Sequence, residues 1–307
     1  MYFGQGTATN SGIVGDDNRW VDTYPFFHDY PGANIALLGQ NFTTKNRFSA
    51  SKEDDAFTGA YLPYSVPASS GAVINGNIRA SGSILRANRD GSGLELVAWG
   101  LRNPFRLKFD RSNRLFATNH GIDERGSRPI ANSPDEFHII RRGMWYGWPD
   151  YTGGLSVTMP MFKPVNKPQP ENLLQHHPMK PPRPLASFAP HSAIMGFDFN
   201  YHSSFASVGD VFIAEFGSEA PTTTGGKPTP FVGHRVSRID VQTGQITPFA
   251  INKTGVAASE TDGGGFERPI DVVFGPSGDM YIVNFGLFPP KGQSVSKTGV
   301  IWRVVKK

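Results

Sequence analysis

Two arginines in similar loops stand out for the chemistry they offer. Arg102 and Asn103 precede Pro104, between apolar runs at 94–99 and 107–109, and Arg268 occupies the corresponding loop near the C-terminus. A guanidinium presents N–H donors in a planar fork that matches a carboxylate. The residues alone leave open whether Arg102 binds an anion or anchors its loop, and whether Asn103 is a ligand or a turn residue.

The absence of one residue type excludes several kinds of site. The chain has eight histidines and no cysteine. Without cysteine there is no thiolate nucleophile, no zinc–thiolate centre and no disulfide framework. No histidine lies in a motif that by itself indicates catalysis.

The elements that position these loops are predicted to be strands. The 307 residues include 35 glycines and 25 prolines, about a fifth of the chain against a usual share of about 12%. So many helix breakers argue against a helical protein, while 38% hydrophobic residues are enough for a packed core. Short apolar runs closed by glycine recur throughout, which predicts an all-β protein.

Charge and hydropathy narrow the function classes further. The net charge of +4 comes from scattered basic residues rather than a basic face or run, which argues against nucleic-acid binding. No apolar stretch approaches the roughly 18–20 residues of a transmembrane helix, and the first residues lack the basic and apolar regions of a signal peptide.

Two strand patterns repeat along the chain. Residues 107–121 match 272–286 as strand, turn, strand and closing glycine, and 197–217 is a looser copy. A second element recurs at 83–88, 235–240 and 300–305. Repeating four-strand units predict a β-propeller, and the alternative is an all-β protein whose hairpins simply look alike.

The repeat also bears on the start of the chain. Residues 1–6 read like 280–286, so the chain is expected to open on the second strand of a hairpin. About four blades can be counted, with closing glycines at Gly6, Gly121, Gly217 and Gly286. We expect an N-terminally truncated propeller, with a four-bladed ring or an open arc as the competing explanation.

A set of motifs resembles one known family. Gly100-Leu-Arg-Asn-Pro-Phe105, Asn119-His-Gly121, residues 135–140 and Gly143-Met-Trp-Tyr-Gly-Trp-Pro149 follow in the order found in the glucose/sorbosone dehydrogenase family, and 190–193 and 268–278 resemble its later blades. The resemblance implies a six-bladed propeller that carries pyrroloquinoline quinone (PQQ) and Ca²⁺. It predicts one domain over residues 1–307 that lacks the first blades.

The resemblance also assigns candidate site residues. It places Arg102, Asn103, Arg268, Gln5 and His191 at the cofactor, with Lys227 as a weaker candidate. Backbone carbonyls of Gly121 and Ile122 correspond to Ca²⁺ ligands, and Glu136 and Tyr146 to a second, structural Ca²⁺ site. The competing interpretation for Asp123, Glu124 and Glu136 is a solvated acidic loop.

The implied reaction is PQQ-dependent oxidation of the hydroxyl or aldehyde of an aldose or sorbosone-type sugar. The family's general-base histidine corresponds to a position upstream of Met1, so no catalytic residue is assigned and reduced activity is expected. The implied partners are a sugar substrate and an external electron acceptor, without nucleic acid or a membrane span. The resemblance further implies a periplasmic or secreted bacterial protein, as a monomer or homodimer.

Two alternatives and two structural expectations remain. The chain could instead be a non-catalytic propeller that binds carbohydrate or protein, or a lactonase-type propeller whose metal is held by side-chain carboxylates. The proline-rich stretch 163–184 reads as a long exposed polyproline-like connection. Trp145, Trp148 and Trp302 are expected to pack within blades.

Overall fold

The computed structural model describes residues 1–51, 53–203, 208–218, 223–225, 232–287 and 294–305. Strands β1 to β20 dominate this part of the chain, with three short 3₁₀ helices, η1 (Arg19–Asp22), η2 (Pro160–Phe162) and η3 (Ala258–Glu260). The predicted all-β class is therefore confirmed. No helix among the described residues has the length and apolar character needed to cross a membrane.

The chain forms two compact units, each built from several separate segments. The first contains Met1–Pro104, Gly121–Ser133 and Ile140–Arg183, and the second contains Phe105–His120, Pro134–Ile139 and Pro184–Lys307. Whether they make up one domain, as the sequence predicts, stays a prediction.

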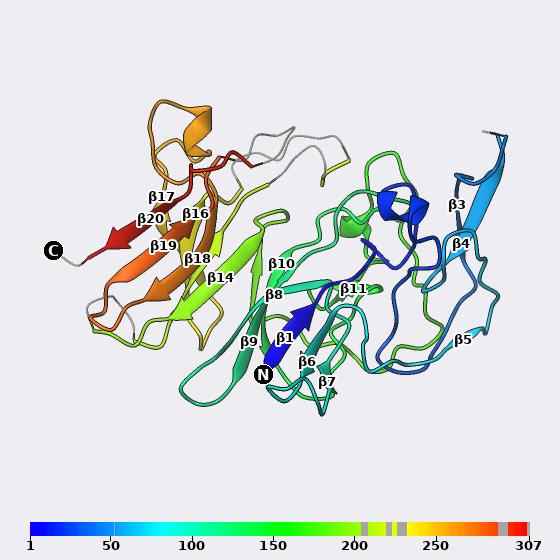
Figure 1. Cartoon of the computed structure of the whole chain (residues 1–307), viewed down its shortest axis with the longest axis horizontal. Coiled ribbons are helices and arrows are strands. Elements are labelled where there is room, and N and C mark those ends of the chain that lie inside the picture. The colour runs from blue at the N-terminus through cyan, green and yellow to red at the C-terminus, as the bar shows by residue number, and fades with distance from the viewer. Residues whose placement is uncertain (52, 204–207, 219–222, 226–231, 288–293, 306–307) are drawn as a thin grey trace. The chain divides into compact units, whose positions relative to one another are not determined.

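The first unit has one three-stranded antiparallel sheet and several two-stranded ones (Figure 1). The larger sheet has the order β1 (Tyr2–Gln5), β6 (Ser83–Arg86), β7 (Glu95–Ala98). The smaller pairs are β2 (Ile35–Ala36) with β5 (Val73–Ile74), β3 (Asn41–Lys45) with β4 (Asp55–Gly59), and β11 (Tyr151–Thr152) with β12 (Leu155–Ser156).

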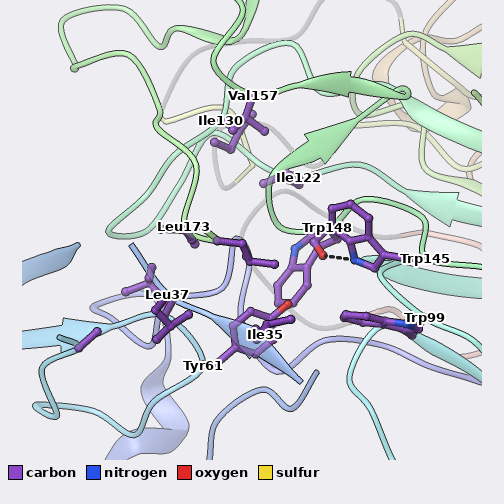
Figure 2. Packing of buried hydrophobic residues seen from close by; sticks show 14 of the residues in the cluster. Ile35, Leu37, Tyr61, Trp99, Ile122, Ile130, Trp145, Trp148, Val157 and Leu173 are labelled. Carbon is purple, nitrogen blue, oxygen red and sulfur yellow. Dashed lines mark hydrogen bonds between the residues drawn. The ribbon is translucent and has the colours of Figure 1, made fainter. Parts of the chain in front are cut away.

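Aromatic and aliphatic side chains pack together in the core of the first unit (Figure 2). Trp145 is fully buried, and its Nε1 donates a hydrogen bond to the Trp148 carbonyl at 3.2 Å. Trp99 lies against Trp145 with ring centroids 6.0 Å apart. Gly100 follows Trp99 with φ +78°, and a Cβ there would lie 2.2 Å from Trp145 Cδ1. The chain needs glycine at this position because both the backbone conformation and the close indole exclude a side chain.

Three antiparallel sheets make up the second unit (Figure 1). The first has the order β13 (Ala186–Phe188), β10 (Asp135–Ile140), β9 (Leu115–His120), β8 (Asn103–Phe109). The next runs β14 (Ile194–Phe199), β15 (Val211–Glu215), β16 (Arg235–Ile239), β17 (Ile246–Ile251). The last is β18 (Pro269–Phe274), β19 (Met280–Asn284), β20 (Val300–Val304). Phenylalanines including Phe116, Phe137 and Phe197 pack between the first two.

The predicted repeats correspond to real strand pairs. The hairpin copies at 107–121, 197–217 and 272–286 contain β8–β9, β14–β15 and β18–β19, and the second element contains β6, β16 and β20. Strand β1 pairs with β6 as β19 pairs with β20. Strand β10 holds the same position beside β9, a copy that the sequence comparison missed. The number of blades stays a prediction.

Two expectations about exposure are wrong. The stretch 163–184 is not a fully exposed connection, because Leu173 and Leu174 are each 2% exposed and belong to the core of the first unit. Trp302 is 40% exposed and contacts Phe266 edge-on, whereas Trp145 and Trp148 are buried as expected. Strand β20 is the edge of its sheet, which leaves Trp302 covered on fewer sides.

Candidate functional site

The end of β1 lies against the Arg102–Pro104 loop in the first unit. Thr7 N donates a hydrogen bond to the Arg102 carbonyl at 2.9 Å. A Cβ added at Gly6 would lie 2.9 Å from Asn103 Oδ1, so the Asn103 side chain reaches the backbone just beyond Gln5. Gln5 Nε2 donates to the Arg79 carbonyl at 3.5 Å. The structure thus brings together Gln5, Arg102 and Asn103, which are separated by about 100 residues in sequence.

Arg102 is held in place by two side chains from other segments. Its Nη2 donates to Asp123 Oδ2 at 2.9 Å and to Asn10 Oδ1 at 3.4 Å. Asn10 Nδ2 in turn donates to the Asp123 carbonyl at 2.8 Å, and Asn10 Oδ1 accepts from Asp123 N at 2.9 Å. The side chains of Arg102 and Asp123 are 16% and 13% exposed. Asp123 is therefore a partner of Arg102, and the solvated acidic loop is the wrong interpretation for it.

The ion-pair network continues beyond Asp123. Arg125 Nε donates to Asp123 Oδ2 at 3.0 Å, and its Nη1 contacts Asp17 Oδ2 at 2.5 Å. Burial raises the pKa of Asp17, and the charge of Arg125 opposes that rise. The four groups alternate in sign, so Arg102 stands in a locally balanced network that fixes its side chain without a large net charge.

A backbone oxygen beside this network suits a cation. Ile122 is 2% exposed, and its N–H donates to Ser133 Oγ at 2.7 Å. Among the described residues no N–H or O–H donates to the Ile122 carbonyl. A buried acceptor without a donor is uncommon in proteins. The oxygen fits a role as ligand to a hard cation such as Ca²⁺, and Gly121 precedes it in the same loop.

Tyr146 also belongs to the first unit, where its hydroxyl is engaged by the protein. It accepts a hydrogen bond from Arg141 N at 2.9 Å. Burial raises the pKa of Tyr146 to about 12, so the group is a neutral phenol at neutral pH. Its part in a second Ca²⁺ site stays a prediction.

In the second unit, Arg268 lies within a cluster of loops. It is 5% exposed, its Nη1 donates to the Ser218 carbonyl at 3.1 Å, and its guanidinium lies 5.2 Å from the Phe216 ring centroid. His234 lies nearby through its Nδ1 contact of 2.8 Å with the Glu267 carbonyl. Burial lowers the pKa of His234. The sequence assigns His234 no role, because the Glu267 residue whose carbonyl it contacts lies 33 residues away along the chain.

The other two candidates in the second unit are His191 and Glu136. His191 has φ +66° in a turn, and the next residue, Ser192, accepts from Gly217 N at 2.9 Å, which links this turn to the Arg268 cluster. Glu136 is 4% exposed and its Oε2 contacts Asn119 Nδ2 and His138 Nε2, each at 2.8 Å. The solvated acidic loop is thus wrong for Glu136 as well.

The candidates therefore fall into two groups, each described within its own unit. Gln5, Arg102, Asn103, Gly121, Ile122 and Tyr146 belong to the first, and Glu136, His191 and Arg268 to the second. Lys227 lies outside the described residues. The guanidinium of Arg102 fits an anionic quinone, and the Ile122 carbonyl, which accepts from no donor in the described part of the chain, fits the hard cation that accompanies it.

The lactonase alternative needs a different kind of site. Its metal would be held by several side-chain carboxylates or imidazoles. In the part of the chain that the structure describes, no group of three or more such side chains is arranged to hold a metal ion.

Comparison with known proteins identifies the family. A sequence model of the glucose/sorbosone dehydrogenase family matches residues 66–220, a little more than half of the chain. The chain belongs to the glucose/sorbosone dehydrogenase family. The matched span contains Arg102, the Gly121–Ile122 pair, Glu136, Tyr146 and His191. Membership confirms the predicted family and agrees with the predicted β-propeller class. No curated protein sequence matches the chain.

Several solved structures resemble this family member. They include the apo form of a soluble aldose sugar dehydrogenase from Escherichia coli, at 19% identity and TM-score 0.45, covering 74% of this chain and 55% of that one. A PQQ-bound aldose sugar dehydrogenase from Streptomyces coelicolor gives 18% identity, TM-score 0.45 and coverages of 86% and 72%. A calcium structure of a Trichoderma reesei family AA12 carbohydrate-active enzyme gives 14% identity and TM-score 0.48, covering 74% of this chain and 60% of that one. The chain thus spans about half the length of the Escherichia coli protein.

Proposed function

We propose that this protein is a PQQ- and Ca²⁺-dependent oxidoreductase that acts on the hydroxyl or aldehyde of an aldose or sorbosone-type sugar and passes the electrons to an external acceptor. Family membership supports the proposal. The single structural observation that carries it is the fixed Arg102 guanidinium beside the loop in which the buried Ile122 carbonyl accepts from no donor among the described residues. We further propose that the protein is periplasmic or secreted and that it is a monomer or homodimer.

Different residues of the first unit would bind PQQ and Ca²⁺. Arg102 and Asn103 would hold carboxylate or quinone oxygens of PQQ, with Gln5 beside them. Asp123 and Asn10 orient Arg102, so the guanidinium loses little side-chain freedom on binding. The Gly121 and Ile122 carbonyls would hold Ca²⁺. Bound PQQ would supply the two-electron oxidant.

Arg268 and His191, in the second unit, are proposed as further contacts of the cofactor. Glu136 and Tyr146 are each proposed as ligands of a structural Ca²⁺. No histidine of this chain is proposed as the base. His120, His138, His177 and His234 already contact the Ile194 carbonyl, Glu136, Asp150 and the Glu267 carbonyl. We therefore expect slow turnover of the sugar.

A single-turnover experiment tests this function. The protein is loaded with PQQ and Ca²⁺ under anaerobic conditions, and the absorbance of bound PQQ is followed after addition of glucose or another aldose. We expect slow reduction that depends on aldose concentration and is absent with the non-reducing sugar trehalose. Bound PQQ that stays oxidised with every aldose would show that the protein is not a sugar oxidoreductase.

A further inference from the structure

A polar hollow in the first unit shares no residue with the proposed PQQ and Ca²⁺ sites. It has a volume of about 500 Å³ and lies between the start of β3, the loop 126–129 and the proline-rich segment 167–171. This volume falls within the usual range of small-molecule pockets, about 300–1,000 Å³. All three walls belong to the same unit.

Hydrogen bonds join the walls to one another. Arg128 is 3% exposed, and its Nη2 donates to the Glu171 carbonyl at 2.6 Å and to Asp150 Oδ1 at 3.2 Å. Gln40 Nε2 donates to the Glu171 carboxylate, which joins the β3 wall to the proline-rich wall. The hollow is therefore built into the fold and requires little ordering when a ligand binds.

The wall residues carry unused hydrogen-bonding capacity of both kinds. Three buried atoms have no partner among the described residues: the acceptor Gln40 Oε1, the donor Arg128 Nε and the hydroxyl Ser127 Oγ. Asp16 and Lys167 are exposed at the hollow, and their charged groups make no hydrogen bond or ion pair with the described residues. Unpaired polar groups around one hollow indicate that a polar ligand or ordered water completes them.

The charges of the wall select against an anion. The charge of Arg128 is balanced by Asp150, so the remaining charges of the lining are one ammonium, Lys167, and two carboxylates, Asp16 and Glu171. Phe42 adds an apolar surface to the same hollow. A hydroxyl group both donates and accepts, so a ligand rich in hydroxyls can pair with acceptors and donors together. Its C–H faces can lie on the aromatic ring.

We infer that this hollow is a binding site for a neutral saccharide. The inference does not depend on PQQ binding or on oxidation of a sugar. It gives the protein a place to hold a carbohydrate through residues other than those proposed for the cofactor.

Titration calorimetry on PQQ-free protein tests the inference, with glucose and maltotriose as probes. We expect a Kd on the order of 1 mM for the better of the two. The double variant Asp16→Ala/Lys167→Ala removes two exposed charged groups that make no hydrogen bond or ion pair within the described part of the chain, so the fold is retained. Loss of two hydrogen bonds of about 0.5–1.5 kcal/mol each predicts roughly 5- to 140-fold weaker binding. The matched control Lys163→Ala/Asp262→Ala removes exposed charges outside the hollow and is expected to bind as wild type.

Two further measurements define the ligand class. Thr43→Trp, which places an indole at the hollow, is expected to abolish binding. Glucuronate, the anionic counterpart of glucose, is expected to bind more weakly than glucose. Absence of saccharide binding, equal binding by the double variant and wild type, or tighter binding of glucuronate would each overturn the inference. Arg102→Met changes the proposed PQQ site and is expected to leave saccharide binding at the hollow unchanged. Failure of the hollow to bind saccharide can therefore be distinguished from failure of the proposed function.

Discussion

The buried pair Arg128–Asp150 is expected to be a main determinant of stability in the first unit. The two side chains are 2% and 0% exposed. Asp150 Oδ1 accepts from Arg128 Nη2 at 3.2 Å and from Leu173 N at 2.8 Å, and Oδ2 accepts from Leu174 N at 3.0 Å and from His177 Nε2 at 3.1 Å. Burial lowers the pKa of Arg128, and the charge of Asp150 opposes that shift.

Asp150→Asn removes the charge while keeping the volume. If the amide oxygen stays toward Arg128, the NH₂ group faces the Leu174 N–H, so one buried donor loses its acceptor and meets another donor. Breaking a buried ion pair from one side costs about 3–5 kcal/mol, and an unsatisfied buried N–H costs about 1–3 kcal/mol. The two costs share the same site and do not add fully. We expect a loss of about 3–5 kcal/mol in the free energy of unfolding.

Urea unfolding followed by tryptophan fluorescence measures this loss. Trp20, Trp99, Trp145 and Trp148 all belong to the first unit, and Trp145 stacks on the ring of His177. With an m value near 3 kcal/mol/M, the midpoint is expected to fall by about 1 M or more.

The matched control for this prediction is an exposed ion pair of the same unit. Asp55 contacts Lys45 at 3.2 Å, with side chains 42% and 64% exposed. Asp55→Asn is expected to cost less than about 1 kcal/mol. A loss below 1 kcal/mol for Asp150→Asn, or equal losses for the two variants, would refute the reasoning from burial.

Two other predictions concern backbone conformation and pH. Gly100→Ala is expected to lower the free energy of unfolding by about 2–5 kcal/mol, since strain at positive φ adds to a clash with Trp145. Gly91→Ala, with φ +85° and open space around it, is expected to cost about 1 kcal/mol; equal losses in thermal melts would contradict the steric argument. Burial lowers the pKa of His234 in the folded protein, so below about pH 6.5 the unfolded chain binds more protons than the folded one. The free energy of unfolding therefore decreases as the pH is lowered through this range. His234→Asn, which tolerates φ +55°, is expected to flatten that slope between pH 7.5 and 5.5, and an unchanged slope would exclude His234 as its source.

The strand repeats could be predicted because they depend on local pattern. Apolar alternation closed by glycine marks β8–β9, β14–β15 and β18–β19, and each forms the expected hairpin. The repeated strand pattern did not reveal strand β10, because its buried positions include the polar residues Glu136 and His138. They satisfy each other inside the sheet, which a pattern of apolar residues does not reveal.

The sequence singles out the candidate residues but not the contacts that hold them in place. Arg102 follows from its motif, whereas its partners Asn10 and Asp123 lie 92 and 21 residues away and meet it only through tertiary folding. The proline-rich stretch 163–184 was misjudged for the same reason. Composition favours an exposed segment, but the adjacent Leu173 and Leu174 are held in the core by Asp150.

Calorimetric titration of PQQ in the presence and absence of Ca²⁺ tests the central claim most directly. We predict binding that requires Ca²⁺ and becomes about 10- to 100-fold weaker in Arg102→Met, because charge-assisted hydrogen bonds of about 1.5–3 kcal/mol are lost. The control variant Arg89→Met, at an exposed arginine, is predicted to bind PQQ as wild type. Binding that is absent, independent of Ca²⁺, or equal in Arg102→Met and wild type would contradict the account.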